Sequence, residues 1–359
     1  MHTSCESSNR PADANFPCPG CGGRVSLALW ADQAVNGFAP RRCATCDLVF
    51  TTPPVPPESL DVYYPETYYG QRNVRFKGIF EWLVHWFSAR RVRKICGMHA
   101  PGRVLDIGCG RGQFLDQLRS LGWQALGAEL NAHAACHARE VLHLDVTVGP
   151  FDPRAYAPHS LDAIVLWHVL EHLPHPDQVF QSAANLLQPG GILVIAVPNF
   201  ASWQARFSGT GWFHLDIPRH LSHFSESWLR TRLAAVGFRI AEVNHYSLEQ
   251  NPFGWIQSVL NRLGFERNLL YDILKDRAAR TIRQPFRRFP VQSLLSLGGA
   301  VLLLPFACLM SVIDAAFGRG ATIEIYAIAT DAATVPQVEA EPAESDTRTL
   351  TATTRPISR

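Results

Sequence analysis

Short apolar runs alternate with helical patterns from residue 103 onward. Buried parallel strands are read as short continuous apolar runs, and helices as apolar residues spaced three or four apart. Apolar residues with this helical spacing occur around Leu115 and again around Ala183. The pattern therefore predicts a parallel sheet covered by helices on both faces. The predicted strands are 104–107, 124–129, 161–167, 192–197, 239–244 and 322–329.

The rest of the chain divides by composition. Paired cysteines precede a Pro-rich stretch, an amphipathic helix is expected over 74–99, and the last residues are rich in Thr, Ala, Glu and Pro. A tail of this composition has too few apolar residues to form a core. We therefore expect a flexible N-terminus (1–16), a zinc-binding module (17–52), a linker with the amphipathic helix (53–99), a main domain (100–330) and a disordered tail (331–359).

A long apolar insertion, 246–318, separates the last two predicted strands. Its uncharged segment 291–313 is long enough to span a bilayer, but the final strand must return to the same sheet, which excludes a single crossing. Pro305 is expected to divide this segment, and a re-entrant hairpin or a helix that lies in the membrane interface is compatible with the return of the chain. The basic stretch 275–288 is of the kind that binds the anionic head groups of lipids. A helical cap on the core and a dimer contact are equally compatible with the pattern.

Composition limits the classes of partner. The formal net charge is +2 and 18% of residues are charged, so no global field attracts nucleic acid. The first twenty residues are polar and contain no apolar stretch typical of a secretory signal. We expect a cytoplasmic protein, peripheral to the inner face of the membrane if the apolar segment contacts lipid.

Four of the nine cysteines form two CxxC pairs. Cys18, Cys21, Cys43 and Cys46 offer enough thiolates to close a tetrahedral zinc site, which leaves no open position for catalysis. The spacing predicts structural Zn²⁺. The alternatives are four buried cysteines without a metal, or a redox pair.

A glycine-rich loop follows the first predicted strand of the main domain. Asp106, Gly108, Cys109, Gly110 and Gly112 lie between this strand and a helix, where backbone amides can approach a ligand. The GxGxG spacing differs from the GxGxxG of nicotinamide enzymes, although glycine loops also serve phosphates and dinucleotides. The next strand ends at Glu129, which either accepts both ribose hydroxyls of a nucleoside or is a solvated acid.

Four motifs in order carry a family resemblance: 106–112, Glu129, His168–His172 (HVLEH) and Pro189–Gly191. Together they resemble class I S-adenosylmethionine-dependent methyltransferases of the ubiquinone-pathway-like group, over about residues 100 to 245 plus the final strand. The resemblance implies an α/β fold with a doubly wound, mostly parallel seven-stranded sheet and a closing antiparallel pair.

The resemblance also implies roles for individual residues. Asp106 and the glycines would face the methionine end of S-adenosylmethionine, Glu129 the ribose, and the region 149–151 the adenine. We further expect Cys109, Leu130 and His168 to line the cofactor pocket.

The cysteine module is similar to one that precedes the catalytic domain of sugar C-methyltransferases. In those enzymes the module and the tyrosines after it pack near the substrate, so Tyr64, Tyr68 and Tyr69 are expected lid residues and Tyr68 a catalytic candidate. His220 aligns with the histidine that serves there as the base, although Arg219 replaces an acidic neighbour. His223 is the second candidate. Either histidine can instead be a loop residue bonded to the backbone.

The sequence thus predicts a methyltransferase that modifies oxygen or carbon of a small-molecule or lipid-linked acceptor. An RNA methyltransferase with a zinc knuckle is one alternative, but nucleic acid is disfavoured because no dense basic stripe accompanies the knuckle. The end of the strand at Trp167 also lacks the Asn/Asp-Pro-Pro-aromatic motif of amino-directed enzymes. The other alternative is a non-catalytic, membrane-associated binding protein that retains the fold.

Overall fold

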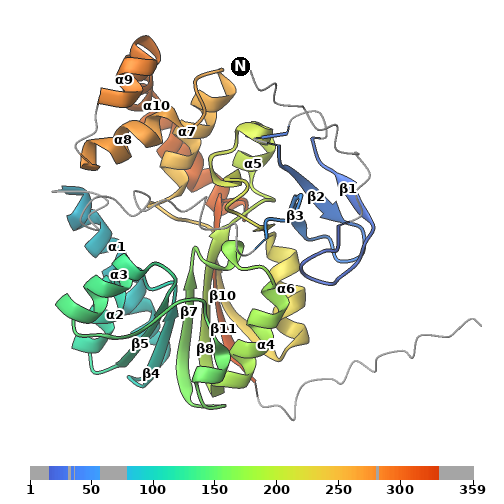
Figure 1. Ribbon diagram of the computed structural model, residues 1–359, viewed down its shortest axis with the longest axis vertical. Helices are drawn as coiled ribbons and strands as arrows, with labels where there is room; N and C mark the ends of the chain where they lie inside the picture. The colour runs from blue at the N-terminus through green and yellow to red at the C-terminus, as the bar shows by residue number, and fades with distance from the viewer. Residues whose placement is uncertain (1–15, 31–33, 36, 57–78, 280–282, 331–359) are drawn as a thin grey trace, which may run out of the picture.

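The computed structural model describes residues 16–30, 34–35, 37–56, 79–279 and 283–330. Within them the chain forms an α/β core, a small sheet that carries the cysteines, and a helical unit. The small sheet and the helical unit lie at opposite sides of the upper edge of the core (Figure 1). The tyrosines 64, 68 and 69, and the tail 331–359, lie outside the described residues.

The core is a seven-stranded sheet with the order β10-β11-β8-β7-β4-β5-β6. β4 pairs in parallel with β5 and β7, β5 with β6, and β7 with β8, whereas β11 is antiparallel to both β8 and β10. The predicted doubly wound, mostly parallel sheet is therefore confirmed. The strands are β4 (Arg103–Ile107), β5 (Gln124–Glu129), β6 (Asp145–Val148), β7 (Leu161–Trp167), β8 (Leu187–Pro198), β10 (Phe238–Asn244) and β11 (Thr322–Ala329).

Helices cover both faces of this sheet because alternate strand residues point to opposite sides. Val104 packs with residues of α1 (Ile79–Met98) and α2 (Gln113–Ser120), while Leu105 packs with residues of α4 (Pro176–Leu186) and α6 (Glu226–Ala235). The short helix α3 (Ala132–Cys136) adds to the first face. Among the side chains of α1 that the structure describes, 85–98, the buried apolar residues are Val92 and Ile95, whereas Trp86 is exposed.

The small sheet joins two distant parts of the chain. Its strands β1 (Ser26–Ala28), β2 (Ala39–Cys43) and β3 (Val49–Thr52) are extended by β9 (Ser222–His223), which pairs antiparallel with β3. Phe50 of β3 belongs to the same buried cluster as Phe224 and Trp228, next to β9. The cysteine module is therefore packed onto the core at the segment that carries His220 and His223.

The insertion forms a helical unit before β11. Its helices are α7 (Asn251–Arg262), α8 (Leu269–Ala279), α9 (Arg283–Arg288) and α10 (Pro290–Ala316), and α5 (Trp203–Ser208) lies next to α7. The expectation that Pro305 divides the apolar segment is wrong, because α10 continues through it. Leu303 and Ala307, on either side of Pro305, pack in one cluster with residues of α7, and this support offsets the hydrogen bond that proline cannot make.

Candidate functional site

The glycine loop lies at the carboxyl edge of the sheet, between β4 and α2. Gly108 has φ +77°, and a Cβ there would clash with the side chain of Val169 in the HVLEH segment, so the two segments touch. Gly110 has φ +55°, and a Cβ there would meet nothing within 4 Å. The open space over Gly110 is therefore where a ligand can come close to the main chain.

The amides of this loop are already used inside the protein. Gly108 and Cys109 both donate to the carbonyl of Ala128 (2.7 and 3.3 Å), and Gly112 donates to the carbonyl of Cys109 (3.0 Å). Gly110 donates to Oε2 of Glu129 (2.8 Å). The sequence suggested amides aimed at a ligand, but these four are not. A loop without these donors is poorly suited to phosphate.

Glu129 ends β5 directly beside the loop. Its two carboxylate oxygens are held by the amides of Gly110 and Asn131 (2.8 and 2.7 Å), which fixes the carboxylate while each oxygen keeps a further lone pair. Burial raises its pKa, and the bonds from those amides oppose this rise. The amide of Gly149 donates to the carbonyl of Glu129 (2.9 Å), so the region expected to meet adenine lies next to this acid.

Asp106 is the second acid at the loop. It is buried on β4, and burial raises its pKa to about 8, with Arg91 opposing the rise and Glu129 adding to it. Cys109 is buried too, and its Sγ lies where a Cβ at Gly127 of β5 would clash, so its side chain packs into the core. Leu130 is exposed at the rim. The loop thus presents two carboxylic acids and open space, a combination that suits a ligand with hydroxyls and positive charge.

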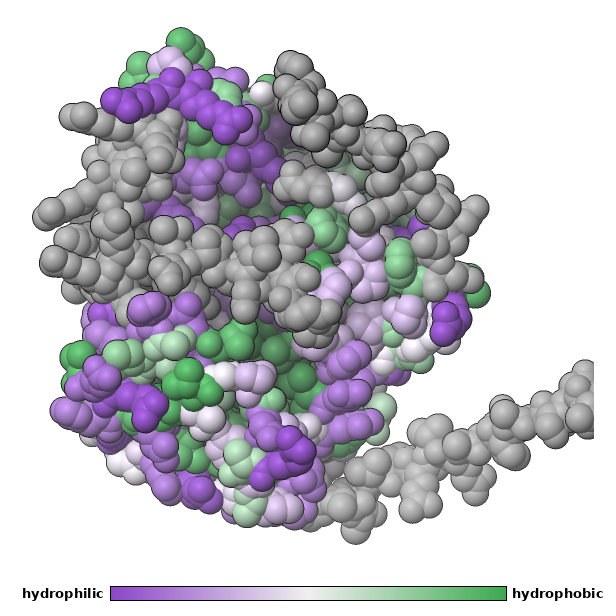
Figure 2. Space-filling view, viewed as in Figure 1, coloured by the Kyte–Doolittle hydropathy of each residue, from purple (hydrophilic) through white to green (hydrophobic). Residues whose placement is uncertain are grey.

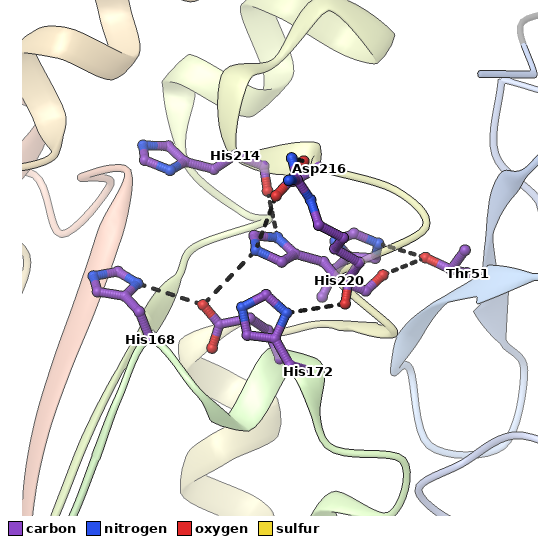
Figure 3. Close-up of polar contacts among 9 residues, drawn as sticks. Thr51, His168, His172, His214, Asp216 and His220 are labelled. Carbon is purple, nitrogen blue, oxygen red and sulfur yellow. Dashed lines mark hydrogen bonds and ion pairs between the residues drawn. The ribbon is translucent and has the colours of Figure 1, made fainter. Parts of the chain in front are cut away.

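Histidines from two segments lie close together (Figure 3), and His168 and His220 both lie near the carboxylate of Glu171. His168 Nδ1 lies 3.4 Å from Glu171 Oε1, and His220 Nε2 lies 4.0 Å from the same oxygen. The rings of His172 and His220 are 4.7 Å apart. Asp216 adds a carboxylate, with Oδ2 3.9 Å from His220 Nε2. His168 follows β7 directly, and β7 is the neighbour of β4, so this histidine cluster lies beside the glycine loop.

Burial controls the charge of the histidines. It lowers the pKa of His220 well below its ordinary value, and nearby His172 and His223 add to this effect. Burial also lowers the pKa of His214 and of His223 to about 3. His220 is therefore neutral at physiological pH, the form in which a general base must be before it accepts a proton.

The loop that carries His220 is attached to the cysteine module. The Thr51 hydroxyl of β3 donates to the carbonyl of His220 (2.6 Å) and lies 3.2 Å from Nε2 of His223. His220 and His223 are both buried, and their rings are 6.3 Å apart. Sequence reasoning did not identify Thr51, His214 or Asp216, since no local motif marks them.

The four cysteines of the two CxxC pairs converge. Cys18 and Cys46 lie 3.6 Å apart at sulfur, as do Cys21 and Cys43, and all four sulfurs lie within 4.8 Å of one another. Thiolates in a tetrahedral zinc site are separated by about 3.8 Å, given Zn–S bonds of about 2.3 Å. The hydrogen bond from Cys18 lowers the pKa of the Cys46 thiol to about 5 and raises that of Cys18. This donor set fits a zinc ion.

A cavity of about 480 Å³ lies between α1 and the same edge of the sheet. Trp167 at the end of β7 lines it, together with Asn244 at the end of β10 and Glu324 near the start of β11. The Arg91 guanidinium is stacked 4.3 Å from the centre of the Trp167 ring. Since Trp167 precedes His168, this polar cavity adjoins the histidine cluster and has the size of a small-molecule site.

Comparison with known proteins identifies this architecture. Residues 87–243 match a family described as "Methyltransferase domain". This segment is a class I methyltransferase domain.

The methyltransferase domain has relatives among curated bacterial proteins. The ubiquinone biosynthesis O-methyltransferase of Xanthomonas campestris pv. campestris (strain B100) is 32% identical over 148 residues, which are 36% of this chain and 62% of that protein. The protein of the same name from Xanthomonas euvesicatoria pv. vesicatoria (strain 85-10) is 31% identical over 144 residues, or 38% of this chain and 60% of that protein. The chain spans about three fifths of the length of the curated relatives it matches.

Among solved structures, a SAM dependent methyltransferase from Archaeoglobus fulgidus is similar to the methyltransferase domain and its surroundings. The sequence identity is 20% and the TM-score 0.42, over 68% of this chain and 93% of that one. This likeness adds no argument to the assignment, which rests on the family match and the strand order.

Proposed function

We propose that this protein transfers a methyl group from S-adenosylmethionine to oxygen or carbon of a small-molecule or lipid-linked acceptor. The observation that carries the proposal is the glycine loop of the methyltransferase domain, where Glu129 bonds to Gly110 beside open space and Asp106 lies on the preceding strand. The four amides of Gly108, Cys109, Gly110 and Gly112 are satisfied within the protein. S-adenosylmethionine has ribose hydroxyls, an ammonium group and a sulfonium, and lacks a phosphate, so it matches these groups.

In this proposal Glu129 accepts hydrogen bonds from the ribose hydroxyls, and Asp106 faces the methionine end over Gly108, Gly110 and Gly112. Cys109 supports the loop from the core side, and Leu130 and His168 border the pocket. Methyl transfer is an in-line displacement at carbon, so most of the acceleration comes from holding donor and acceptor in line.

The histidine cluster is the proposed acceptor end. A hydroxyl or carbon acid must lose a proton as it attacks the methyl group, and His220 is our candidate for the residue that accepts it. His223 is the second candidate. Tyr68 remains a predicted lid residue outside the described part of the chain.

We propose that Cys18, Cys21, Cys43 and Cys46 hold a structural zinc ion. Their sulfur spacing and the packing of Cys18, Cys43, Leu48 and Phe50 into the core cluster support this role. The ion would fix β2 and β3, and through β3 the segment that carries His220 and His223.

We also propose that α10 rests on the surface of a membrane with anionic lipids. α10 has 27 residues, and its most apolar stretch of 18 residues has a mean hydropathy of 2.1 with only 17% of that stretch buried in the protein. Arg287 and Arg288 are exposed just before it, and its one charged residue, Asp314, is buried. Figure 2 shows hydrophobic and hydrophilic side chains next to each other at the outer tip of the helical unit.

A crossing helix would not fit this chain. α10 packs along α7, and β11 begins six residues after α10 ends and inserts between β8 and β10. Both ends of α10 therefore lie on the same side of a membrane as the domain. We propose that α10 lies in the plane of the membrane interface.

Isothermal titration with S-adenosylhomocysteine tests the cofactor site. Glu129→Ala should weaken binding by about 1.5–3 kcal/mol, roughly ten- to a hundredfold, because a charge-assisted contact is lost. The control is Glu140→Ala, at an exposed glutamate that follows Glu129 in the chain, and it should leave the affinity for S-adenosylhomocysteine unchanged. Equal affinity of Glu129→Ala and the parent protein would remove the ribose assignment, and no affinity in the parent protein would remove the whole proposal.

The proton acceptor is tested by transfer of tritium from [methyl-³H]-S-adenosylmethionine into an organic extract that contains the acceptor. His220→Ala should bind S-adenosylhomocysteine normally but transfer methyl roughly a hundredfold more slowly. A loss of the same size in His223→Ala alone would move the role to His223.

A further inference from the structure

We propose that Glu171, His172 and His220 form a binding site for a divalent transition-metal ion, separate from the four cysteines. One ligand atom of each residue lies within 4.8 Å of the ligand atoms of the other two. Two imidazoles and one carboxylate are a donor set typical of first-row divalent metals. The binding itself does not depend on the proposed function, whereas its catalytic consequence does.

The distances leave room for an ion. His220 Nε2 and Glu171 Oε1 are 4.0 Å apart, too far for a hydrogen bond between them. Donors bound at about 2.1 Å to one ion are separated by roughly 3.0–3.5 Å, so an ion needs this pair to approach by about half an ångström to one ångström. Rotation of the side chains supplies a change of this size. Oδ2 of Asp216, 3.9 Å from His220 Nε2, is near enough to add a fourth donor.

Both imidazoles are oriented as metal ligands usually are. Nδ1 of His220 lies 2.8 Å from the carbonyl of His214, and Nδ1 of His172 lies 3.0 Å from the carbonyl of Arg219. A carbonyl only accepts, so each Nδ1 carries a proton, and in the neutral form of each ring the lone pair is on Nε2. A backbone carbonyl that holds the opposite ring nitrogen is the usual outer support of a metal-bound histidine.

A second, independent observation concerns the carboxylate of Glu171. Its side chain is buried, with 1% of the residue exposed, and Oε2 has no hydrogen-bond partner within the described part of the chain. A buried carboxylate oxygen without a partner is costly, because neither water nor a donor replaces its lost hydration. A bound cation at this oxygen removes that cost.

The ion would lie beside the glycine loop, since Val169 of the same segment contacts Gly108. An acceptor hydroxyl bound to the ion loses its proton to solvent more readily. The resulting oxygen anion forms a bond to the methyl carbon, the carbon–sulfur bond breaks, and its electron pair returns to sulfur as a neutral thioether. With the ion bound, His220 holds it and the proton goes to solvent, whereas in the ion-free site His220 is the candidate proton acceptor.

The test uses the full chain with its cysteines loaded with zinc, titrated with Mn²⁺ and followed by electron paramagnetic resonance of the free ion. Mn²⁺ favours oxygen and nitrogen over thiolate, so it reports on the histidine site. We expect one bound Mn²⁺ per chain, and an affinity at least tenfold lower in Glu171→Gln and in His172→Gln. His175→Ala, at an exposed histidine next to the cluster, should bind Mn²⁺ as the parent does.

Absence of Mn²⁺ binding to the parent protein, or equal affinity in Glu171→Gln and His172→Gln, would overturn the proposal. Binding of S-adenosylhomocysteine by each variant checks that the fold is retained. It also separates the two claims: Mn²⁺ binding without any affinity for S-adenosylhomocysteine would leave the ion site standing and contradict the proposed function. Restoration of methyl transfer by added Mn²⁺ in chelator-treated, zinc-loaded protein would support the catalytic consequence.

Discussion

Asp106 shows how burial sets the response of the cofactor site to pH. Its raised pKa, about 8, means that the carboxyl is mostly protonated at neutral pH while the site is empty. A cationic ligand favours the carboxylate, since the opposite charge compensates for lost hydration. Arg91 and Glu129 are the charged groups that act on it, with opposite signs.

We therefore predict that the affinity for S-adenosylhomocysteine rises from pH 6 to pH 8. Below its pKa, binding that requires the ionised acid strengthens by up to about tenfold per pH unit. Asp106→Asn should flatten this dependence, and Asp116→Asn, on the exposed side of α2, should keep it. Titration calorimetry at three pH values measures the effect. An unchanged pH profile in Asp106→Asn would show that this acid does not face the ligand's charge.

At the scale of single elements, the pair β3–β9 connects the cysteine module to the catalytic segment. Thr51 is buried, and its hydroxyl holds the His220 carbonyl across a separation of 169 residues in the chain. This residue positions the loop and does not touch a substrate in our proposal.

Thr51→Val keeps the shape of the side chain and removes its hydroxyl. We expect a loss of about 1 kcal/mol in the free energy of unfolding, from one hydrogen bond, and slower methyl transfer with an unchanged affinity for S-adenosylhomocysteine. Thr52→Val is the matched control, because the Thr52 hydroxyl bonds to Ala39 inside the module. Denaturation curves and the tritium assay measure the two effects. A parallel loss in cofactor affinity would mean that Thr51 acts on the whole fold.

Elements with strong local patterns were predictable. β5, β7 and β11 have the bounds that their apolar runs predicted, because each lies inside the sheet. β6 was missed, since it lies at the sheet edge and only Val146 is buried in it. The break at Pro305 was predicted from a local rule, and packing against α7 overrides that rule. Motif order identified the glycine loop and Glu129, whereas Thr51 and Asp216 reach the site only through tertiary structure.

At the scale of the whole molecule, the outer face of α10 is an exposed apolar surface. Leu295 and Leu302, two turns apart, are 56% and 82% exposed, and Val291, Phe306 and Leu309 extend the same face. An apolar face of this length is unusual on a protein that meets only water.

We predict that the protein floats with liposomes that contain phosphatidylglycerol and that 0.5 M NaCl weakens this binding by screening Arg287 and Arg288. Leu295→Asp with Leu302→Asp should lower partitioning by at least about a hundredfold, since each leucine that enters the lipid contributes about 1.5–3 kcal/mol. Val25→Asp, at an exposed valine of the cysteine module, is the control. A salt-independent dimer that forms through α10 without lipid, detected by light scattering, would contradict membrane contact.

The position of β11 has a consequence for how the protein is made. This strand is synthesised after the whole helical unit, yet it fills the gap between β8 and β10. During translation the edge of β8 that later pairs with β11 is therefore unpaired while α7 to α10 emerge from the ribosome. Unpaired strand edges pair readily with other chains. The nascent protein should depend on chaperones over this interval, and a ribosome stalled before Thr322 should release an aggregating product.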